Sequence, residues 1–195
     1  MAEVIKAIPT SYARQTFRSR LEARWAVYFN EIETRWWYEF CTVTHGSSGH
    51  SYTPDFVLCP RMHIEIKPSK PSTDYLEKLL RFAFTVNLVL IIGSPDNASV
   101  IVVPSEWGRS LNKFATVDID GAYKSGPTVL FDCPAGGWLT SHIECFDPYL
   151  LLGHGPFRGD AQEMDDAREA YDVAVKAARF ASNYRFDLEN GGASR

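Results

Sequence analysis

Candidate chemistry is concentrated between residues 51 and 67, in the segment SYTPDFVLCPRMHIEIK. Nine residues separate Asp55 from Glu65, and Lys67 follows two positions later. Two carboxylates on adjacent strands offer hard oxygen ligands, which suit Mg²⁺ or Mn²⁺. Such a cation would polarise a phosphate and lower the pKa of a bound water, while the lysine would stabilise charge developing on the phosphate. These groups are suited to metal-assisted hydrolysis of a phosphodiester bond.

Two strands must position these groups. We predict strands at residues 52–58 and 62–68, joined by three residues, which is short enough for a hairpin. Side chains alternate between the faces of a strand, so His63, Glu65 and Lys67 are expected on one face and the intervening isoleucines on the core face. Charged groups on core strands are costly unless they are paired or bind something. The pattern favours a functional site, although a surface ion pair of Glu65 with Lys67 remains an alternative.

The surrounding elements predict the fold class. Helices are expected at residues 20–33, 73–84 and 160–181, and further strands at 35–43, 86–92 and 99–103 and near 128–131 and 138–144. A sheet with helices packed on it fits this order best. We therefore expect an α/β (α+β) fold, with a central mixed β-sheet flanked by helices in the order helix, three strands, helix, strand.

The chain is expected to divide into two parts. Residues 1–155 would form one domain with its core at 16–103, and residues 156–195 a C-terminal extension built on an amphipathic helix. Within the first part, residues 1–16 are expected to be an irregular lead-in, and residues 44–51, THGSSGHS, to be a loop.

Composition excludes several classes of protein. Hydrophobic residues make up 45% of the 195 residues, which is typical of a globular chain rather than a disordered one. No apolar run is long enough for a membrane helix and the N-terminus lacks a secretory signal, so we expect an intracellular protein that does not enter membranes. The four cysteines form no C-x-x-C pair and are expected to be buried thiols. A zinc site from Cys133, His142 and Cys145 is the alternative.

The spacing of Pro54-Asp55 and Glu65-Ile66-Lys67 resembles the signature of the PD-(D/E)XK nucleases, the restriction-endonuclease-like superfamily. The upstream FRSRLE and the proline after IEIK strengthen this resemblance. The combination is closest in motif to phage-type junction resolvases and to the endonuclease subunits of Tn7-type transposition systems. The resemblance covers residues 16–103.

The resemblance implies a role for each matching residue. Asp55 and Glu65 would bind Mg²⁺, or Mn²⁺ in its place, together with the backbone carbonyl of Ile66. Lys67 would be the catalytic lysine. Glu22, on the first helix, would help to bind the metal or a metal-bound water. The implied activity is that of a metal-dependent DNA endonuclease.

Several of these residues have a second explanation. Ser19 and Glu22 form an S-x-x-E capping box, which alone would account for Glu22. Glu39 would either lie near the site or pair with one of the arginines that flank Glu22. These arginines and one lysine of the second helix would contact DNA phosphates or belong to a solvated face. The candidate DNA-binding residues are Arg18, Arg20, Arg24 and Lys78.

The net charge of −4 is unevenly distributed along the chain. Residues 160–172 carry −5, so the rest of the chain carries +1, and residues 1–30 carry +3. A locally basic region is what phosphate contact requires. The acidity therefore does not exclude DNA as a partner.

The leading hypothesis is a Mg²⁺-dependent DNA endonuclease. The alternative is a nucleic-acid-binding or assembly module that keeps the nuclease fold without catalysis, and residues 104–195 would then serve to bind a protein partner. A junction resolvase would be expected to form a homodimer, because it must cut two strands symmetrically. The sequence does not distinguish among DNA structures, or between DNA and RNA.

Overall fold

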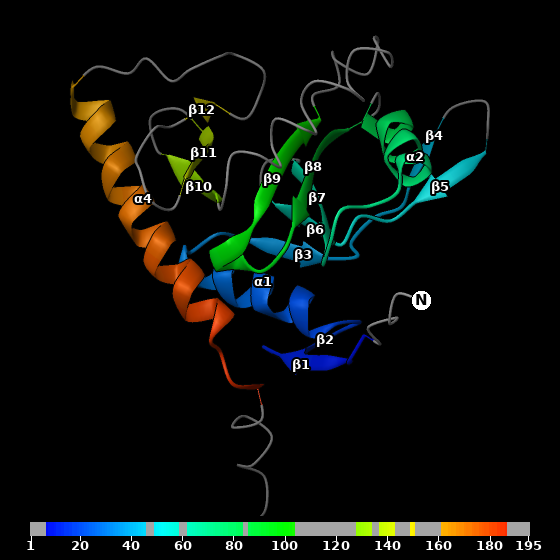
Figure 1. The fold of residues 1–195 in the computed structure, drawn as a ribbon, viewed down its shortest axis with the longest axis horizontal. Coiled ribbons are helices and arrows are strands. Elements are labelled where there is room, and N and C mark those ends of the chain that lie inside the picture. Colours follow the sequence, from blue (N-terminus) through cyan, green and yellow to red (C-terminus); the bar gives the residue numbers. More distant parts are fainter. Residues whose placement is uncertain are drawn as a thin grey trace, which may run out of the picture.

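A mixed five-stranded sheet organises the protein in the computed structural model, which describes residues 7–45, 49–58, 62–83, 86–103, 128–133, 137–142, 149–150 and 161–186 (Figure 1). The elements are β1 (Thr10–Tyr12), β2 (Gln15–Phe17), α1 (Arg20–Glu31), β3 (Trp36–Tyr38), β4 (Val43–His45), β5 (His50–Tyr52), β6 (Phe56–Leu58), β7 (Met62–Lys67), α2 (Thr73–Ala83), β8 (Asn87–Ile92), the 3-10 turn η2 (Pro95–Asn97), β9 (Ser99–Val103), β10 (Thr128–Cys133), β11 (Gly137–His142), β12 (Tyr149–Leu150) and α4 (Ala161–Ser182). None of the helices in these ranges is long and apolar enough to cross a membrane.

The strand order β3-β6-β7-β8-β9 confirms the predicted mixed sheet. Neighbouring strands are antiparallel except β7 and β8, which run parallel because α2 carries the chain back between them. Among the strands of this sheet, the order α1, β3, β6, β7, α2, β8 is the predicted helix, three strands, helix, strand, with the separate β4–β5 hairpin inserted between β3 and β6. The predicted α+β class with a C-terminal helix is therefore confirmed.

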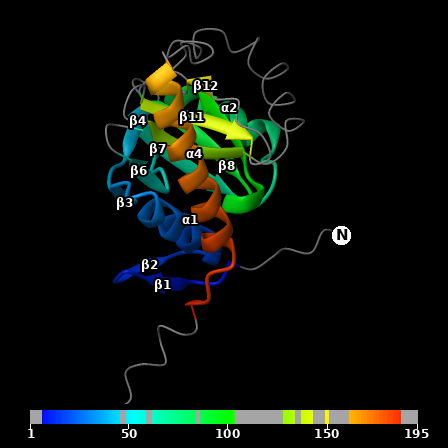
Figure 2. The same ribbon diagram turned by 90° about the vertical axis from the view of Figure 1, so that its left-hand side faces the viewer.

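Both faces of the sheet are buried. On one face, Trp25 and Phe29 of α1 pack with Ile64 of β7 in a core that includes the alanine stripe of α4. Figures 1 and 2 show α4 lying alongside α1. On the other face, a second cluster joins α2, β8 and the β4–β5 hairpin through Tyr52 and Leu90, among other residues. The charged residues of β7 therefore lie between two apolar layers.

Two segments predicted to be irregular form hairpins instead. β1 and β2 pair around Ala13 and Arg14, whose φ angles of 49° and 65° are those of a tight turn that usually contains Gly or Asn. Neither residue signals such a turn, so the sequence did not predict the hairpin. The segment 44–51 contributes to a second hairpin, in which β5 pairs with β4. Each of these two strands has three residues, which is too short for a periodic pattern in the sequence. The strand expected at 35–43 is also interrupted, because Glu39 has a φ of 46°.

The alternative zinc site is excluded by the β10–β11 register. Cys133 is opposite Gly137, whereas His142 is opposite Thr128 at the other end of the hairpin. Five residues of strand separate the two positions, which is about 17 Å. One zinc ion cannot reach both. Cys145 lies outside the described residues, and Cys41 is a free, half-buried thiol.

Gly93 directly follows β8 and lies next to Lys67, the last residue of β7. Its amide donates to the Lys67 carbonyl at 2.8 Å, and its carbonyl accepts from Trp25 Nε1 at 3.1 Å. Gly93 has a φ of 101°, and a Cβ added to it would lie 2.4 Å from the backbone oxygen of Asn97. We expect Gly93→Ala to lower the free energy of unfolding by about 2–4 kcal/mol, measured by urea denaturation.

The matched control is Gly49→Ala. Gly49 also has a positive φ, 65°, but a Cβ there would meet nothing within 4 Å. Only the left-handed backbone is then penalised, by about 1–2 kcal/mol. Equal losses for the two variants would contradict the predicted clash at Gly93.

Candidate active site

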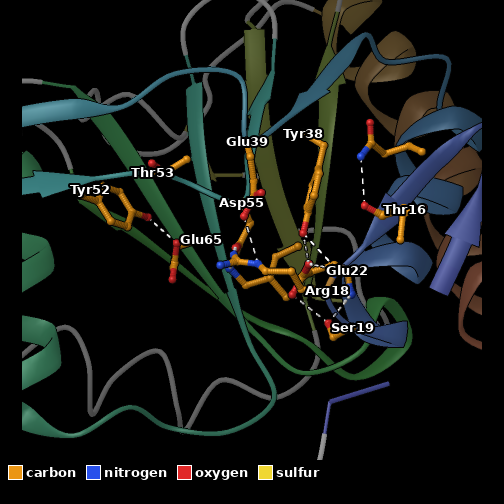
Figure 3. A network of polar contacts seen from close by, with 12 residues as sticks. Thr16, Arg18, Ser19, Glu22, Tyr38, Glu39, Tyr52, Thr53, Asp55 and Glu65 are labelled. Carbon is orange, nitrogen blue, oxygen red and sulfur yellow. Dashed lines mark hydrogen bonds and ion pairs between the residues drawn. The ribbon is translucent and has the colours of Figure 1, made fainter. Parts of the chain in front are cut away.

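Three carboxylates come into register at one end of the sheet. Phe56 is paired with Ile64, which places Asp55, just before β6, opposite Glu65 of β7. The amide of Glu39, just after β3, donates to the Asp55 carbonyl at 3.0 Å and continues the row (Figure 3). The side chains of Asp55 and Glu65 are 2% and 4% exposed, so the predicted pair is both adjacent and buried.

Asp55 is held from two sides. Its Oδ2 accepts from the Ile66 amide at 2.8 Å, and its Oδ1 accepts from Arg18 Nη2 at 2.6 Å. Arg18 Nε also pairs with Glu39 at 3.0 Å, which confirms the alternative that Glu39 pairs with an arginine. Burial, and then the negative charge of Glu65, raise the pKa of Asp55 to about 7. Two buried carboxylates therefore repel each other here, and a cation between them would relieve that repulsion.

Glu65 accepts three hydrogen bonds. Oε2 accepts from the hydroxyl of Tyr52, and Oε1 accepts from the hydroxyl of Tyr75 and from the ammonium of Lys67. The ammonium also lies 5.0 Å from the centroid of the Tyr75 ring. Burial lowers the pKa of Lys67, but the charge and hydrogen bond of Glu65, together with the charges of Asp55 and Tyr75, raise it by more, so Lys67 carries a proton at neutral pH.

Glu22 makes the capping contacts that the sequence suggested, with one difference. Its amide donates to Ser19 Oγ at 3.2 Å, and Ser19 Oγ donates to Glu22 Oε1 at 2.9 Å. Glu22 Oε2 accepts from the amide of Arg18, one residue before the N-cap, at 3.2 Å, and from the hydroxyl of Tyr38. Arg18 thus connects the two carboxylates: its backbone amide donates to Glu22, and its side chain donates to Asp55. A catalytic role of Glu22 stays a prediction.

The candidate DNA-binding residues differ in exposure and in contacts. Arg18 is 61% exposed but is engaged by Asp55 and Glu39. Arg20 is exposed at the start of α1, and Arg24 is half-buried with its Nε enclosed. Lys78 is exposed on α2 and lines a hollow against the β4–β5 hairpin.

Sequence reasoning missed the three tyrosines that donate to the carboxylates. Tyr38, Tyr52 and Tyr75 come from β3, β5 and the first turn of α2. Their pKa values are raised, chiefly by burial, so they stay protonated as donors. In a chain this rich in aromatic residues, a tyrosine by itself does not signal such a role.

The donor set fits a divalent cation in charge and chemistry. The four carboxylates and two bases of the site carry a formal charge of −2; they are Glu22, Glu39, Asp55, Glu65, Arg18 and Lys67. Carboxylate oxygens are the ligands that Mg²⁺ and Mn²⁺ prefer. No group of three or more His, Cys, Asp or Glu side chains in the described ranges is arranged to hold a metal. Protein donors, Arg18 on Asp55 and Lys67 on Glu65, occupy the two buried carboxylates.

No protein-family model, curated protein or solved structure matches this chain.

Removing the Tyr52 hydroxyl tests how strongly Glu65 depends on its donors. A hydrogen bond to a buried charged group contributes about 1.5–3 kcal/mol, so Tyr52→Phe should lower the free energy of unfolding by that amount. Tyr75→Phe should cost less, because Tyr75 is half-buried and Lys67 still donates to the same oxygen. Urea denaturation of both variants checks the order. A larger loss for Tyr75→Phe would show that Glu65 is held mainly from α2.

Proposed function

We propose that this protein is a metal-dependent DNA endonuclease. Its site for hydrolysis of phosphodiester bonds would be formed by Glu22, Asp55, Glu65 and Lys67. The observation that carries the proposal is the buried, adjacent pair of Asp55 and Glu65 with the Lys67 ammonium against it. Burying two mutually repelling carboxylates costs stability, and cation binding offers a reason for that cost.

Each residue has a part in this proposal. Asp55, Glu65 and the backbone carbonyl of Ile66 would hold Mg²⁺ or Mn²⁺, with Glu22 near the metal or a water bound to it. The cation, when bound, supplies polarisation of the phosphate and a more acidic water. Lys67 holds its proton and stabilises the charge that develops on the phosphate.

The fold order supports the proposal without identifying a family. Membership of the PD-(D/E)XK superfamily, with its motif similarity to junction resolvases and Tn7-type endonuclease subunits, belongs to the proposal. So do DNA as the partner, an intracellular location, a homodimer if the substrate is a junction, and a protein partner through residues 104–195. Sedimentation at several concentrations tests the dimer.

A second candidate is a nucleic-acid-binding module without catalysis. It is favoured by the contacts of Asp55 and Glu65 with Arg18 and Lys67, which partly neutralise both carboxylates without any metal. In that case these residues would stabilise the end of the sheet, and DNA would bind independently of Mn²⁺.

A cleavage panel separates the two candidates. Supercoiled, linear and branched DNA, and an RNA of the same sequence, are incubated with the protein and Mg²⁺ or Mn²⁺. We expect cleavage of at least one DNA form, abolished by EDTA and by Glu65→Gln and kept by the control Glu77→Gln on the exposed side of α2. Binding of DNA without cleavage of any form would favour the second candidate.

A further inference from the structure

Arg18 occupies the solvent side of the Asp55 carboxylate. The side chain of Asp55 is 2% exposed, whereas that of Arg18 is 61% exposed and lies 2.6 Å from it. The inner oxygen of Asp55 is turned to the Ile66 amide. The guanidinium therefore covers the outer oxygen, as the contact of Arg18 with Asp55 in Figure 3 shows.

The Arg18 side chain can leave without disturbing the backbone. The amide of Arg18 is held separately, by Glu22 Oε2 at 3.2 Å and by the Tyr38 hydroxyl at 3.1 Å. Rotation about the side-chain bonds would release Asp55, Glu39 and the side-chain contact with Tyr38, while these two contacts of the backbone amide remain. The exposed guanidinium would then point into solvent, where a phosphate can form a bidentate pair with it.

Lys67 is held differently. Its side chain is 28% exposed, pairs with Glu65 and lies over the Tyr75 ring, so packing restrains it as well as charge. Arg18 pairs with two carboxylates and Lys67 with one, but Arg18 is the more exposed of the two, so we expect solvent and phosphate to reach it first.

We infer that Arg18 is a built-in counter-cation of Asp55 that a DNA phosphate draws away, so that binding of the divalent cation is coupled to binding of DNA. This rests on the proposed function. Without DNA, the metal must compete with the guanidinium for Asp55. With DNA, Arg18 pairs with phosphate and the outer oxygen of Asp55 is released. By linkage, the metal strengthens DNA binding by the same factor.

Mn²⁺ titration with and without DNA tests the coupling. Mn²⁺ affinity is measured by calorimetry at pH 8 for the wild-type protein and for Arg18→Gln, alone and with a short phosphorothioate duplex that keeps the backbone charge. Without DNA, Arg18→Gln should bind Mn²⁺ about tenfold more tightly, the size of a typical coupling between sites. DNA should tighten Mn²⁺ binding by a larger factor in the wild type than in Arg18→Gln.

Two further variants control for charge and for folding. Arg18→Lys keeps the positive charge but not the fork of guanidinium donors. Without DNA its Mn²⁺ affinity should stay near that of the wild type, and DNA should tighten its Mn²⁺ binding by a smaller factor. Arg35→Gln removes an exposed arginine just before β3 and should leave the Mn²⁺ affinity unchanged. Thermal melts confirm that each variant is folded. If Arg18→Gln does not fold, Arg18→Lys carries the test, and equal tightening of Mn²⁺ binding by DNA in Arg18→Lys and the wild type would contradict the inference.

The outcomes separate this inference from the proposed function. Equal Mn²⁺ affinities of wild type and Arg18→Gln without DNA, or equal tightening by DNA, would overturn the inference while leaving the nuclease proposal intact. Absence of Mn²⁺ binding by both proteins, with and without DNA, would overturn the proposed function and the inference together.

Discussion

Replacing Lys67 with methionine is expected to lower the rate of DNA cleavage by about 10²–10⁴-fold, the range for losing a charge-stabilising or proton-transferring group. Methionine keeps an unbranched stem that can pack on Tyr75, but it has no ammonium to place against the phosphate. The Glu65 carboxylate keeps its two tyrosine donors, so the variant should remain folded. Single-turnover cleavage at saturating Mn²⁺ measures the rate of the chemical step.

The matched control is Lys176→Met on the exposed side of α4. It removes the same charge away from the carboxylates and should cleave at the wild-type rate. DNA affinity, measured by fluorescence anisotropy, separates binding from chemistry. If Lys67→Met lost only DNA affinity and cut normally once bound, Lys67 would be a phosphate-binding residue and not a catalytic one.

Asp55→Asn is expected to abolish the response to metal and to change the pH dependence of stability. Asn has no charge to offer a cation, so cleavage should fall by at least about 10³-fold. At pH 8, Mn²⁺ at a hundred times its Kd should stabilise the wild type by about 2.7 kcal/mol and leave Asp55→Asn unchanged. Thermal unfolding with and without Mn²⁺ measures this, with Asp96→Asn on η2 as a control that keeps the response.

The pH dependence follows from the raised pKa of Asp55. In the folded protein this carboxyl has a pKa of about 7, against an ordinary value of 3.8. Between these values the folded chain keeps a proton that the unfolded chain releases, so the contribution of Asp55 to stability is lost as the pH rises from about 4 to 7. Asn does not titrate. The free energy of unfolding of Asp55→Asn, relative to wild type, should therefore increase over that range, by at most about 4 kcal/mol.

Urea denaturation in the absence of metal at pH 4, 5.5 and 7.5 provides the comparison. The groups that act on Asp55 through their charge are present in both proteins, so their own titration largely cancels in the difference; they are Glu65, Lys67, Glu22 and Arg18. Parallel stability profiles of wild type and Asp55→Asn would show that the Asp55 carboxylate is ionised throughout and that its burial is fully compensated.

Local patterns were sufficient for β7 but only in part for β6. The single strand expected at 52–58 is divided, because Tyr52 belongs to β5 of another sheet and β6 begins at Phe56. The alternation around Glu65 and Lys67 predicted β7, with Ile64 and Ile66 in the main core, because side chains along a strand alternate between faces whatever surrounds them. The spacing from Asp55 to Glu65 predicted adjacent strands, because a short connection favours a hairpin. The β1–β2 turn had no such local signal, since it places Ala13 and Arg14 in a conformation usually adopted by Gly or Asn.

The sequence by itself determined which residues of this protein are suited to chemistry, and the tertiary structure decided what each one contacts. The donors to Glu65 come from β5, β7 and α2, and the cation on Asp55 comes from the residue before the N-cap of α1. These contacts join segments up to 37 positions apart in the chain. Periodicity places a side chain on a face of its own element, whereas only the packing of elements against one another selects its partner. Packing, and not periodicity, therefore decides the pairing of Arg18 with Asp55, which motivates the proposed coupling of metal binding to DNA binding.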